Sequence, residues 1–213
     1  MNIKLHVLNT SGKLTSFTSN IKSVSEDTIK EVKKVLPIDS IDVIVWDYPD
    51  WSIEKYGIGG HTLTPNTIVI SIDSENKNLN KNFDKRLKQT IIHEIHHAAR
   101  LQIMDNDKAS RLEHSIREGL AEHFEIELTG KEPEVWDMAL SKEDLDKFVE
   151  VAKTNLSTED YLVYDWLFGN KELGVPKWTG YSVGFYLVGE YLKKHPNKKP
   201  STLYATSANE FVK

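Results

Sequence analysis

The sequence has no cysteine and no long hydrophobic run. Without cysteine the chain forms no disulfide scaffold, has no thiolate nucleophile and binds no metal through sulfur, so any metal ion must be bound by His, Asp or Glu. No stretch approaches the roughly 18 to 20 apolar residues that a membrane span needs. The N-terminal apolar run carries Lys4 and His6, unlike a secretory signal. A cytoplasmic protein is therefore expected, with no membrane partner.

An excess of positive charge is also missing. The 213 residues include 27 basic and 32 acidic side chains, which give a formal net charge of -5. Proteins that bind nucleic acid usually show the opposite balance, so nucleic acid is not an expected partner. Hydrophobic residues make up 39% of the chain, which at this length supplies a core and excludes a disordered or fibrous protein.

The first 75 residues combine strand and helix patterns. Ile3, Leu5 and Val7 alternate with polar residues, as in a half-buried strand. Short β-branched runs bounded by turn residues predict two further strands, over 41–46 and 67–72.

The same region carries one helix signal and one turn-rich segment. Ser23 and Glu26 have the spacing of a capping box, and apolar residues at helical spacing follow, which predicts a helix over about 25–36 that ends before Pro37. The segment 47–65 contains three glycines and two prolines and is expected to be a loop or a wide hairpin.

From about residue 82 the apolar period becomes helical. Gly130 has the position of a C-terminal cap, and Ser141 followed by Asp144 resembles an N-terminal cap. The pattern predicts five helices, over about 82–103, 108–128, 141–156, 158–168 and 181–194. We expect a single domain, 1–213, with an N-terminal α/β lobe over about 1–78, two helices over about 82–130 and a helical C-terminal lobe over about 131–213.

The first of these helices carries a metal-binding motif. Residues 93–97 are His-Glu-Ile-His-His, which fits the pattern H-E-x-x-H. At 100° per residue His93 and His97 lie about 40° apart on one face, one turn from each other, so both imidazoles can reach one ion. His96 is expected to pack or to support the ligands. The apolar residues lie on the opposite side of the helix: Leu87, Ile91, Ile95 and Ala98.

A catalytic zinc site needs a third protein ligand and an open position, and the next helix supplies candidates. Glu118 lies 21 residues beyond His97 and shares a helix face with Glu122. A turn over 105–107 would bring the two helices back antiparallel, so that their polar faces converge. His114, near the same face, is an alternative third ligand, whereas His123 falls near the core side.

Together these motifs resemble those of the gluzincin branch of zinc metallopeptidases, the thermolysin-like group. They are more similar still to a bacterial family of predicted zinc-dependent proteases of unknown function. The shared features are the HExHH core, the Glu-Gly-Leu-Ala segment at 118–121 and an aromatic, glycine-containing helix that includes 180–186. The resemblance spans about residues 57–192.

The resemblance implies a zincin-like α+β fold, with a small twisted sheet and a helix in the N-terminal lobe, a mainly helical C-terminal lobe, and the active-site cleft between them. It implies one Zn²⁺ ion with His93, His97 and Glu118 as ligands. Glu94 would be the general base for hydrolysis of a peptide bond by an activated water, without a covalent intermediate. Glu122 would accept the second ring N–H of a ligand histidine.

The class also needs an oxyanion donor and a substrate-binding strand. Tyr181 is preferred as donor because adjacent glycines allow close helix approach, with Tyr186 and His61 as alternatives, although simple packing also explains these side chains. In zincin folds the strand before the metal helix is a sheet edge to which a peptide adds. Applied to the strand over 67–73 and the segment before it, this assigns substrate binding to Gly60, His61, Ile68 and Ile70. An ordinary buried strand fits the same residues almost as well.

The expected function is therefore a zinc metalloprotease with a peptide or protein substrate. Two alternatives remain: a zincin scaffold that binds peptide or metal without efficient hydrolysis, and a purely structural helical protein. A structural zinc site is normally closed by a fourth ligand, so Glu94 beside the two histidines favours the enzyme.

Overall fold

The structure, a computed structural model, describes residues 2–104, 110–154 and 163–213. The chain divides into two compact units, Met1–Gln102 and Ile103–Lys213, and each is described by itself. The lobe boundaries expected from the sequence stay a prediction. Within the described ranges, no helix combines the length and the apolar character needed to cross a bilayer.

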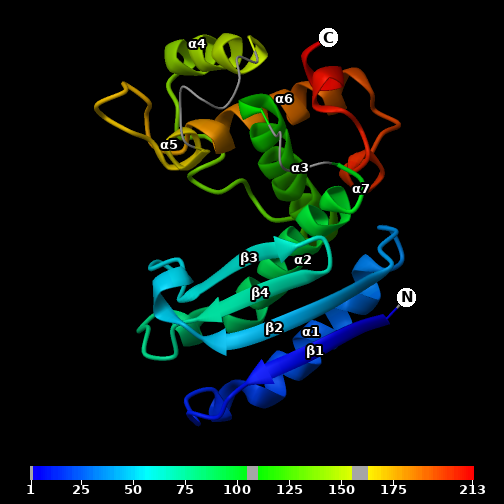
Figure 1. Ribbon diagram of the computed structural model, residues 1–213, viewed down its shortest axis with the longest axis vertical. Coiled ribbons are helices and arrows are strands. Elements are labelled where there is room, and N and C mark those ends of the chain that lie inside the picture. The colour runs from blue at the N-terminus through cyan, green and yellow to red at the C-terminus, as the bar shows by residue number, and fades with distance from the viewer. Residues whose placement is uncertain (1, 105–109, 155–162) are drawn as a thin grey trace. The chain divides into compact units, whose positions relative to one another are not determined.

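The first unit is a four-stranded mixed sheet with two α-helices. Its strands are β1 (Asn2–Leu8), β2 (Ser40–Asp47), β3 (Ile58–Thr64) and β4 (Thr67–Ile72). They lie in the order β1-β2-β4-β3, in which the first two pairs are parallel and the last is antiparallel (Figure 1). Among the described residues, β1 and β3 are thus the edges of the sheet. The expected strands near 3–7, over 41–46 and over 67–72 are confirmed.

The helices α1 (Thr18–Val32) and α2 (Phe83–Leu101) contact each other, and both contact the sheet. The β2 and β4 side chains that pair in register on the face toward α2 are almost fully buried, and so are the apolar residues of α2. This core includes Ile41, Val43, Val45, Ile68, Ile70, Ile72, Leu87, Ile91 and Ile95. Burial of each such side chain stabilises the fold by about 1.5–3 kcal/mol, which fixes the face that α2 turns to the sheet.

The segment 47–65, expected to be a loop or a wide hairpin, contains a strand over 58–64, which is β3 and pairs antiparallel with β4. Two glycines of this strand are required by close neighbours: a Cβ on Gly59 would lie 2.2 Å from the Trp51 carbonyl oxygen, and one on Gly60 would lie 2.6 Å from the Glu94 side chain. Glycine within a strand often marks such a close approach. The glycines that suggested a loop are therefore explained by tight packing of a strand.

The first helix begins earlier than expected. Its N-cap is Phe17, which has no side-chain cap, and Ser23 lies inside the helix, so the predicted capping box is wrong. A 3-10 turn over Thr15–Phe17 leads directly into α1 and supplies its first turn. The helix ends at Val32, before the predicted end, and Leu36 N–H donates to the Val32 carbonyl oxygen at 2.9 Å.

The second unit is helical. Its helices are α3 (Arg111–Thr129), α4 (Lys142–Lys153), α5 (Val163–Phe168), α6 (Thr179–Lys194) and α7 (Pro200–Leu203), and a 3-10 helix follows over Ala208–Val212. Gly130 caps α3 with a φ of 63°, and the Ser141 side chain accepts from Asp144 N–H, as predicted. The expected turn over 105–107, and the parts of the predicted helices over 108–109 and 155–162, lie outside the described residues.

The α3 and α6 helices cross at a pair of glycines. A Cβ on Gly119 would lie 2.3 Å from the carbonyl carbon of Gly184, and one on Gly184 would lie 1.8 Å from the Ser115 carbonyl oxygen. Both distances are far below van der Waals contact, so neither position has room for a side chain. The backbone on both sides of this crossing, including that of Glu118, is therefore held at a fixed separation.

Candidate active site

The His93 and His97 side chains lie next to each other on α2. Their ring centroids are 4.5 Å apart and the rings are nearly perpendicular, at 89°. The apolar face of the same helix is fully buried, and His96 is buried with it at 0% exposure. The burial of His96 agrees with packing rather than with a place beside the histidine pair. The helix therefore keeps two imidazole donors one turn apart on a face that the core does not occupy.

The Glu94 carboxylate is held by the edge strand β3. The Thr62 hydroxyl lies 2.7 Å from Glu94 Oε2 and 3.0 Å from the Glu94 carbonyl oxygen. Gly60, two residues earlier, leaves the space that the Glu94 side chain fills. Glu94 is only 5% exposed. The carboxylate is thus fixed beside the histidine pair by contacts within the first unit. Thr62 was not among the predicted site residues, because nothing in its local sequence pattern marks it.

The predicted edge strand is not the strand over 67–73. Because β4 pairs with β2 on one side and β3 on the other, its main chain offers no free edge. Ile68 and Ile70 are 0% exposed and belong to the core, so their predicted role in binding a substrate is wrong. Gly60 and His61 lie instead on β3, the edge strand.

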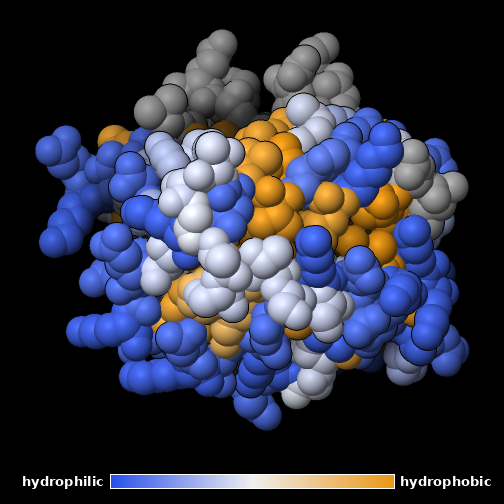
Figure 2. Space-filling view, turned by 90° about the horizontal axis from the view of Figure 1, so that it is seen from below, coloured by the Kyte–Doolittle hydropathy of each residue, from blue (hydrophilic) through white to orange (hydrophobic). Residues whose placement is uncertain are grey.

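The exposed margin of β3 is partly apolar. Leu63 is 52% exposed, and the His61 ring packs against Trp51, with centroids 4.8 Å apart. Trp51 is itself 37% exposed and contacts the rings of Trp46 and Tyr48. Figure 2 shows hydrophobic residues among hydrophilic ones on the face that it views. Exposed apolar and aromatic side chains therefore lie beside this edge of the sheet.

The α3 helix carries the predicted third ligand. Glu118 is 6% exposed, and its Oε1 lies 3.9 Å from Arg117 Nε. The same arginine approaches His114, with Arg117 Nη2 donating to His114 Nδ1 at 3.0 Å. His114, the alternative ligand, thus has one ring nitrogen engaged by Arg117.

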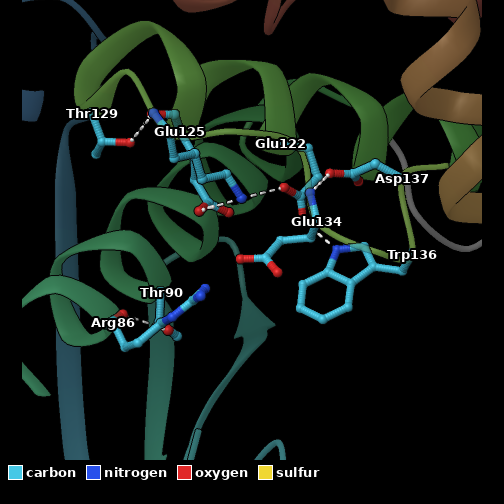
Figure 3. A network of polar contacts seen from close by, with 9 residues as sticks. Arg86, Thr90, Glu122, Glu125, Thr129, Glu134, Trp136 and Asp137 are labelled. Atoms are coloured by element: carbon cyan, nitrogen blue, oxygen red, sulfur yellow. Dashed lines mark hydrogen bonds and ion pairs between the residues drawn. The ribbon is translucent and has the colours of Figure 1, made fainter. Parts of the chain in front are cut away.

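The Glu122 carboxylate is bound on both oxygens within the second unit (Figure 3). Lys131 Nζ donates to Oε2 at 2.6 Å, and Trp136 Nε1 donates to Oε1 at 2.7 Å. Lys131 also pairs with Glu125 at 2.9 Å. Burial lowers the pKa of Lys131, but the charges of Glu125 and Glu122 outweigh this effect and raise its pKa above the ordinary value. Lys131 is therefore a permanent cation that neutralises part of the acidic cluster.

Lys131 reaches Glu122 because α3 ends in a left-handed residue. Gly130 adopts a φ of 63°, a conformation that glycine adopts without steric cost, and the chain turns directly after it. The sequence pattern predicts this cap but not the contacts of the residues that follow it. Lys131 and Trp136 carry no periodic signal, and their contacts depend on the path of the chain after the helix.

Asp137 next to this cluster holds a proton at neutral pH. Burial, followed by the negative charge of Glu122, raises the pKa of Asp137 to about 8, against the effects of the Glu134 N–H and Lys131. Its Oδ2 accepts from Glu134 N–H at 2.7 Å. The folded protein therefore keeps a proton that the unfolded chain loses above the ordinary aspartate value of 3.8.

Because the folded state keeps this proton, the free energy of unfolding should depend on pH. The contribution of Asp137 is fully present below about pH 4 and is lost as the pH rises to about 8, because the folded state binds the extra proton in this window. The side chain of the Asp137→Asn variant does not titrate. Between about pH 5 and about pH 8 the unfolding free energy of this variant should therefore fall less than that of the wild type, and the two slopes should differ by at most about 1.4 kcal/mol per pH unit. Urea unfolding of both proteins measures the difference, and parallel pH profiles would contradict it.

Tyr181, on α6, lies in an aromatic cluster. Its ring centroid is 5.6 Å from that of Trp178 and 6.0 Å from that of Phe168. Tyr186, the alternative oxyanion donor, is 37% exposed. His123 donates through Nε2 to the Phe185 carbonyl oxygen at 3.0 Å, and burial lowers its pKa, as fits a neutral interior histidine.

The candidate residues thus fall into two sets. In the first unit, α2 carries His93, Glu94 and His97, and β3 carries Gly60 and Thr62 against Glu94. In the second unit, α3 carries Glu118 and Glu122, and α6 carries Tyr181. Two imidazoles and several carboxylates are the donors that a cysteine-free zinc site requires.

The comparisons with known proteins point to a class of zinc-dependent protease. The chain belongs to the family described as "Predicted Zn-dependent protease (DUF2268)", whose model matches residues 21–213. It is also 29% identical over 151 residues to the Bacillus subtilis (strain 168) protein described as "Uncharacterized protein YjfC". That match covers 65% of this chain and 48% of the relative, so the chain spans about half the length of that curated protein. No solved structure matches the chain.

Proposed function

We propose that the protein is a zinc-dependent metallopeptidase of the gluzincin type with a zincin-like fold. The observation that carries the proposal is the H-E-x-x-H helix, on which two neighbouring imidazoles flank a glutamate whose carboxylate is held by an adjacent strand. Membership of a family described as predicted zinc-dependent proteases supports the same function.

The proposed metal site holds one zinc ion with His93, His97 and Glu118 as ligands. The donor set fits zinc, because imidazole nitrogen and carboxylate oxygen are its usual ligands where cysteine is absent. When bound, zinc lowers the pKa of a water molecule toward about 7 and polarises a carbonyl group. Three protein ligands leave one position open, as catalysis requires and a structural site does not.

The proposed chemistry of the chain centres on Glu94. Its carboxylate takes the proton of the attacking water as general base and later gives it to the leaving nitrogen as general acid, so the glutamate is regenerated without a covalent intermediate. Tyr181 donates a hydrogen bond to the oxygen that becomes negative when the carbonyl is attacked. Glu122 accepts the second ring N–H of a ligand histidine, and its bonds to Lys131 and Trp136 keep the carboxylate in place for that role.

The proposed substrate is a peptide or an unfolded protein segment. An extended chain can add by main-chain hydrogen bonds to the outer edge of β3 beyond Ile58, which itself forms an antiparallel bridge with Ile53. Gly60 and His61 lie on this strand, and Leu63 and Trp51 supply apolar contact beside it. This assigns recognition of the main chain to β3 in place of the buried β4.

Chelation tests the proposed function directly. The purified full-length protein, loaded with zinc, should cleave members of a peptide library, and mass spectrometry should show products with new termini one water heavier in sum than the parent peptide. A chelator such as EDTA should abolish cleavage, and added zinc should restore it. Chelator-resistant cleavage would overturn the metal mechanism. Bound zinc with no cleavage after long incubation would instead favour a zincin scaffold that binds peptide without efficient hydrolysis.

A further inference from the structure

The edge strand β3 makes a specific polar contact with the helix that carries the histidine pair. Thr62 Oγ1 lies 2.7 Å from Glu94 Oε2, a short distance typical of a hydroxyl that donates to a charged oxygen. The same hydroxyl lies 3.0 Å from the carbonyl oxygen of Glu94. Both the main chain and the side chain of one glutamate are therefore within reach of one hydroxyl group.

Gly60 leaves the space that the Glu94 side chain occupies. A Cβ at this position would lie 2.6 Å from both Cγ and Oε1 of Glu94. Gly60 and Thr62 are two residues apart on β3, so both project toward α2. The strand thus offers Glu94 a space and a hydrogen-bond donor at the same place, and Glu94 is buried to 5% exposure there.

We propose that Thr62 is a positioning residue for Glu94, which aims the carboxylate at the attacking water; the proposal rests on the proposed function. The threonine hydroxyl has one proton and two acceptors within reach. While Glu94 is ionised, the hydroxyl donates to Oε2 and leaves Oε1 to accept the proton of the water. Once Glu94 has gained that proton, the hydroxyl can donate to the Glu94 carbonyl oxygen instead, so it stays hydrogen-bonded in both states.

The position of Thr62 also links the base to the substrate. The β3 strand is the edge strand on which we place the substrate main chain, beyond its bridge at Ile58, and Thr62 follows His61 directly. A side chain on the substrate-binding strand that holds the general base sets the spacing between the base and the bound peptide. Displacement of a reacting group by about 1 Å can cost about 100-fold in rate.

Two variants of Thr62 separate its hydroxyl from its shape. Thr62→Val keeps the branched side chain but removes the donor, and should lower kcat about 10- to 100-fold with KM and zinc content unchanged. Thr62→Ser keeps the hydroxyl and should stay within about threefold of the wild-type kcat. Equal losses in both variants, or a loss that appears in KM alone, would overturn the proposal.

Thr90 offers a matched control. It lies on α2, one turn before Glu94, and its hydroxyl donates within the helix to the Arg86 carbonyl oxygen at 2.9 Å (Figure 3). Thr90→Val makes the same chemical change without removing a bond to Glu94, so its kcat should remain near the wild-type value. A loss as large as that of Thr62→Val would show that the effect is not specific to Thr62, which contradicts the proposal.

A cycle of unfolding experiments tests the contact without turnover. In the full-length protein Thr62→Val should lower the folding equilibrium constant about tenfold, as expected for a lost hydrogen bond to a charged group, and much less when Glu94 is already Leu. Equal losses in the two backgrounds would overturn the proposal. A wild-type protein that binds zinc and cleaves no peptide would overturn the proposed hydrolysis alone, because the cycle still measures the bond between Thr62 and Glu94.

Discussion

Replacement of Glu94 by glutamine should lower kcat by about 10² to 10⁴ while zinc content stays at the wild-type level, because general base catalysis contributes a factor of this size. Glutamine has nearly the same shape and still accepts a hydrogen bond from Thr62, but it cannot take the proton of the attacking water. The measurement is peptide cleavage by a zinc-loaded Glu94→Gln variant, with zinc determined by elemental analysis of the same sample.

Glu132 provides the control for this experiment. It is an exposed glutamate of the second unit, and Glu132→Gln removes one negative charge from the surface. Its rate should remain near that of the wild type. A Glu94→Gln variant that keeps the wild-type kcat would refute the assignment of the base, whereas a loss of zinc in that variant would show that Glu94 supports the metal site itself.

Replacement of Glu118 by alanine should weaken zinc binding about 100-fold or more. Loss of a residue that only supports a ligand typically costs 10- to 100-fold in metal affinity, and loss of a ligand costs at least as much. Competition with a chromophoric zinc chelator measures the dissociation constant, and circular dichroism shows whether α3 is still folded. Unchanged zinc affinity in a folded Glu118→Ala variant would assign the third ligand to His114 or Glu122.

The helical parts of the fold were predictable because their signals are local. The apolar face of α2 repeats at the helical period over its whole length, and the same pattern fixes the face on which His93 and His97 lie. Gly130 and Ser141 cap their helices as expected, since each cap depends on a few neighbouring residues. The family description agrees with the predicted zinc-dependent protease, while the gluzincin branch and the ligand set remain proposals.

The predictions that were wrong concern features that depend on contacts between residues distant in the sequence. Gly59 and Gly60 suggested a loop, but they allow β3 to approach Trp51 and Glu94, which no local pattern reveals. The strand over 67–72 was predicted correctly, but its predicted position at the edge of the sheet was wrong, because the sequence of one strand does not determine which strands pair with it. Its three isoleucines face the core, as the register with β2 requires.

The contacts around the candidate site were hidden for the same reason. Thr62 is an ordinary strand residue by sequence, and only the packing of β3 on α2 brings it to Glu94. Lys131 follows a helix cap, where a lysine would be expected to be exposed, yet it is buried between Glu122 and Glu125.

The crossing of α3 and α6 at two glycines links the backbones of two residues with proposed functions, Glu118 and Tyr181. Glu118 directly precedes Gly119, and Tyr181 lies one helical turn before Gly184, so one main-chain contact anchors both. A side chain at either glycine would clash with the backbone of the other helix, so this close contact requires glycine at both positions. If Glu118 holds the ion and Tyr181 the oxyanion, as proposed, then this one contact sets the separation of their backbones.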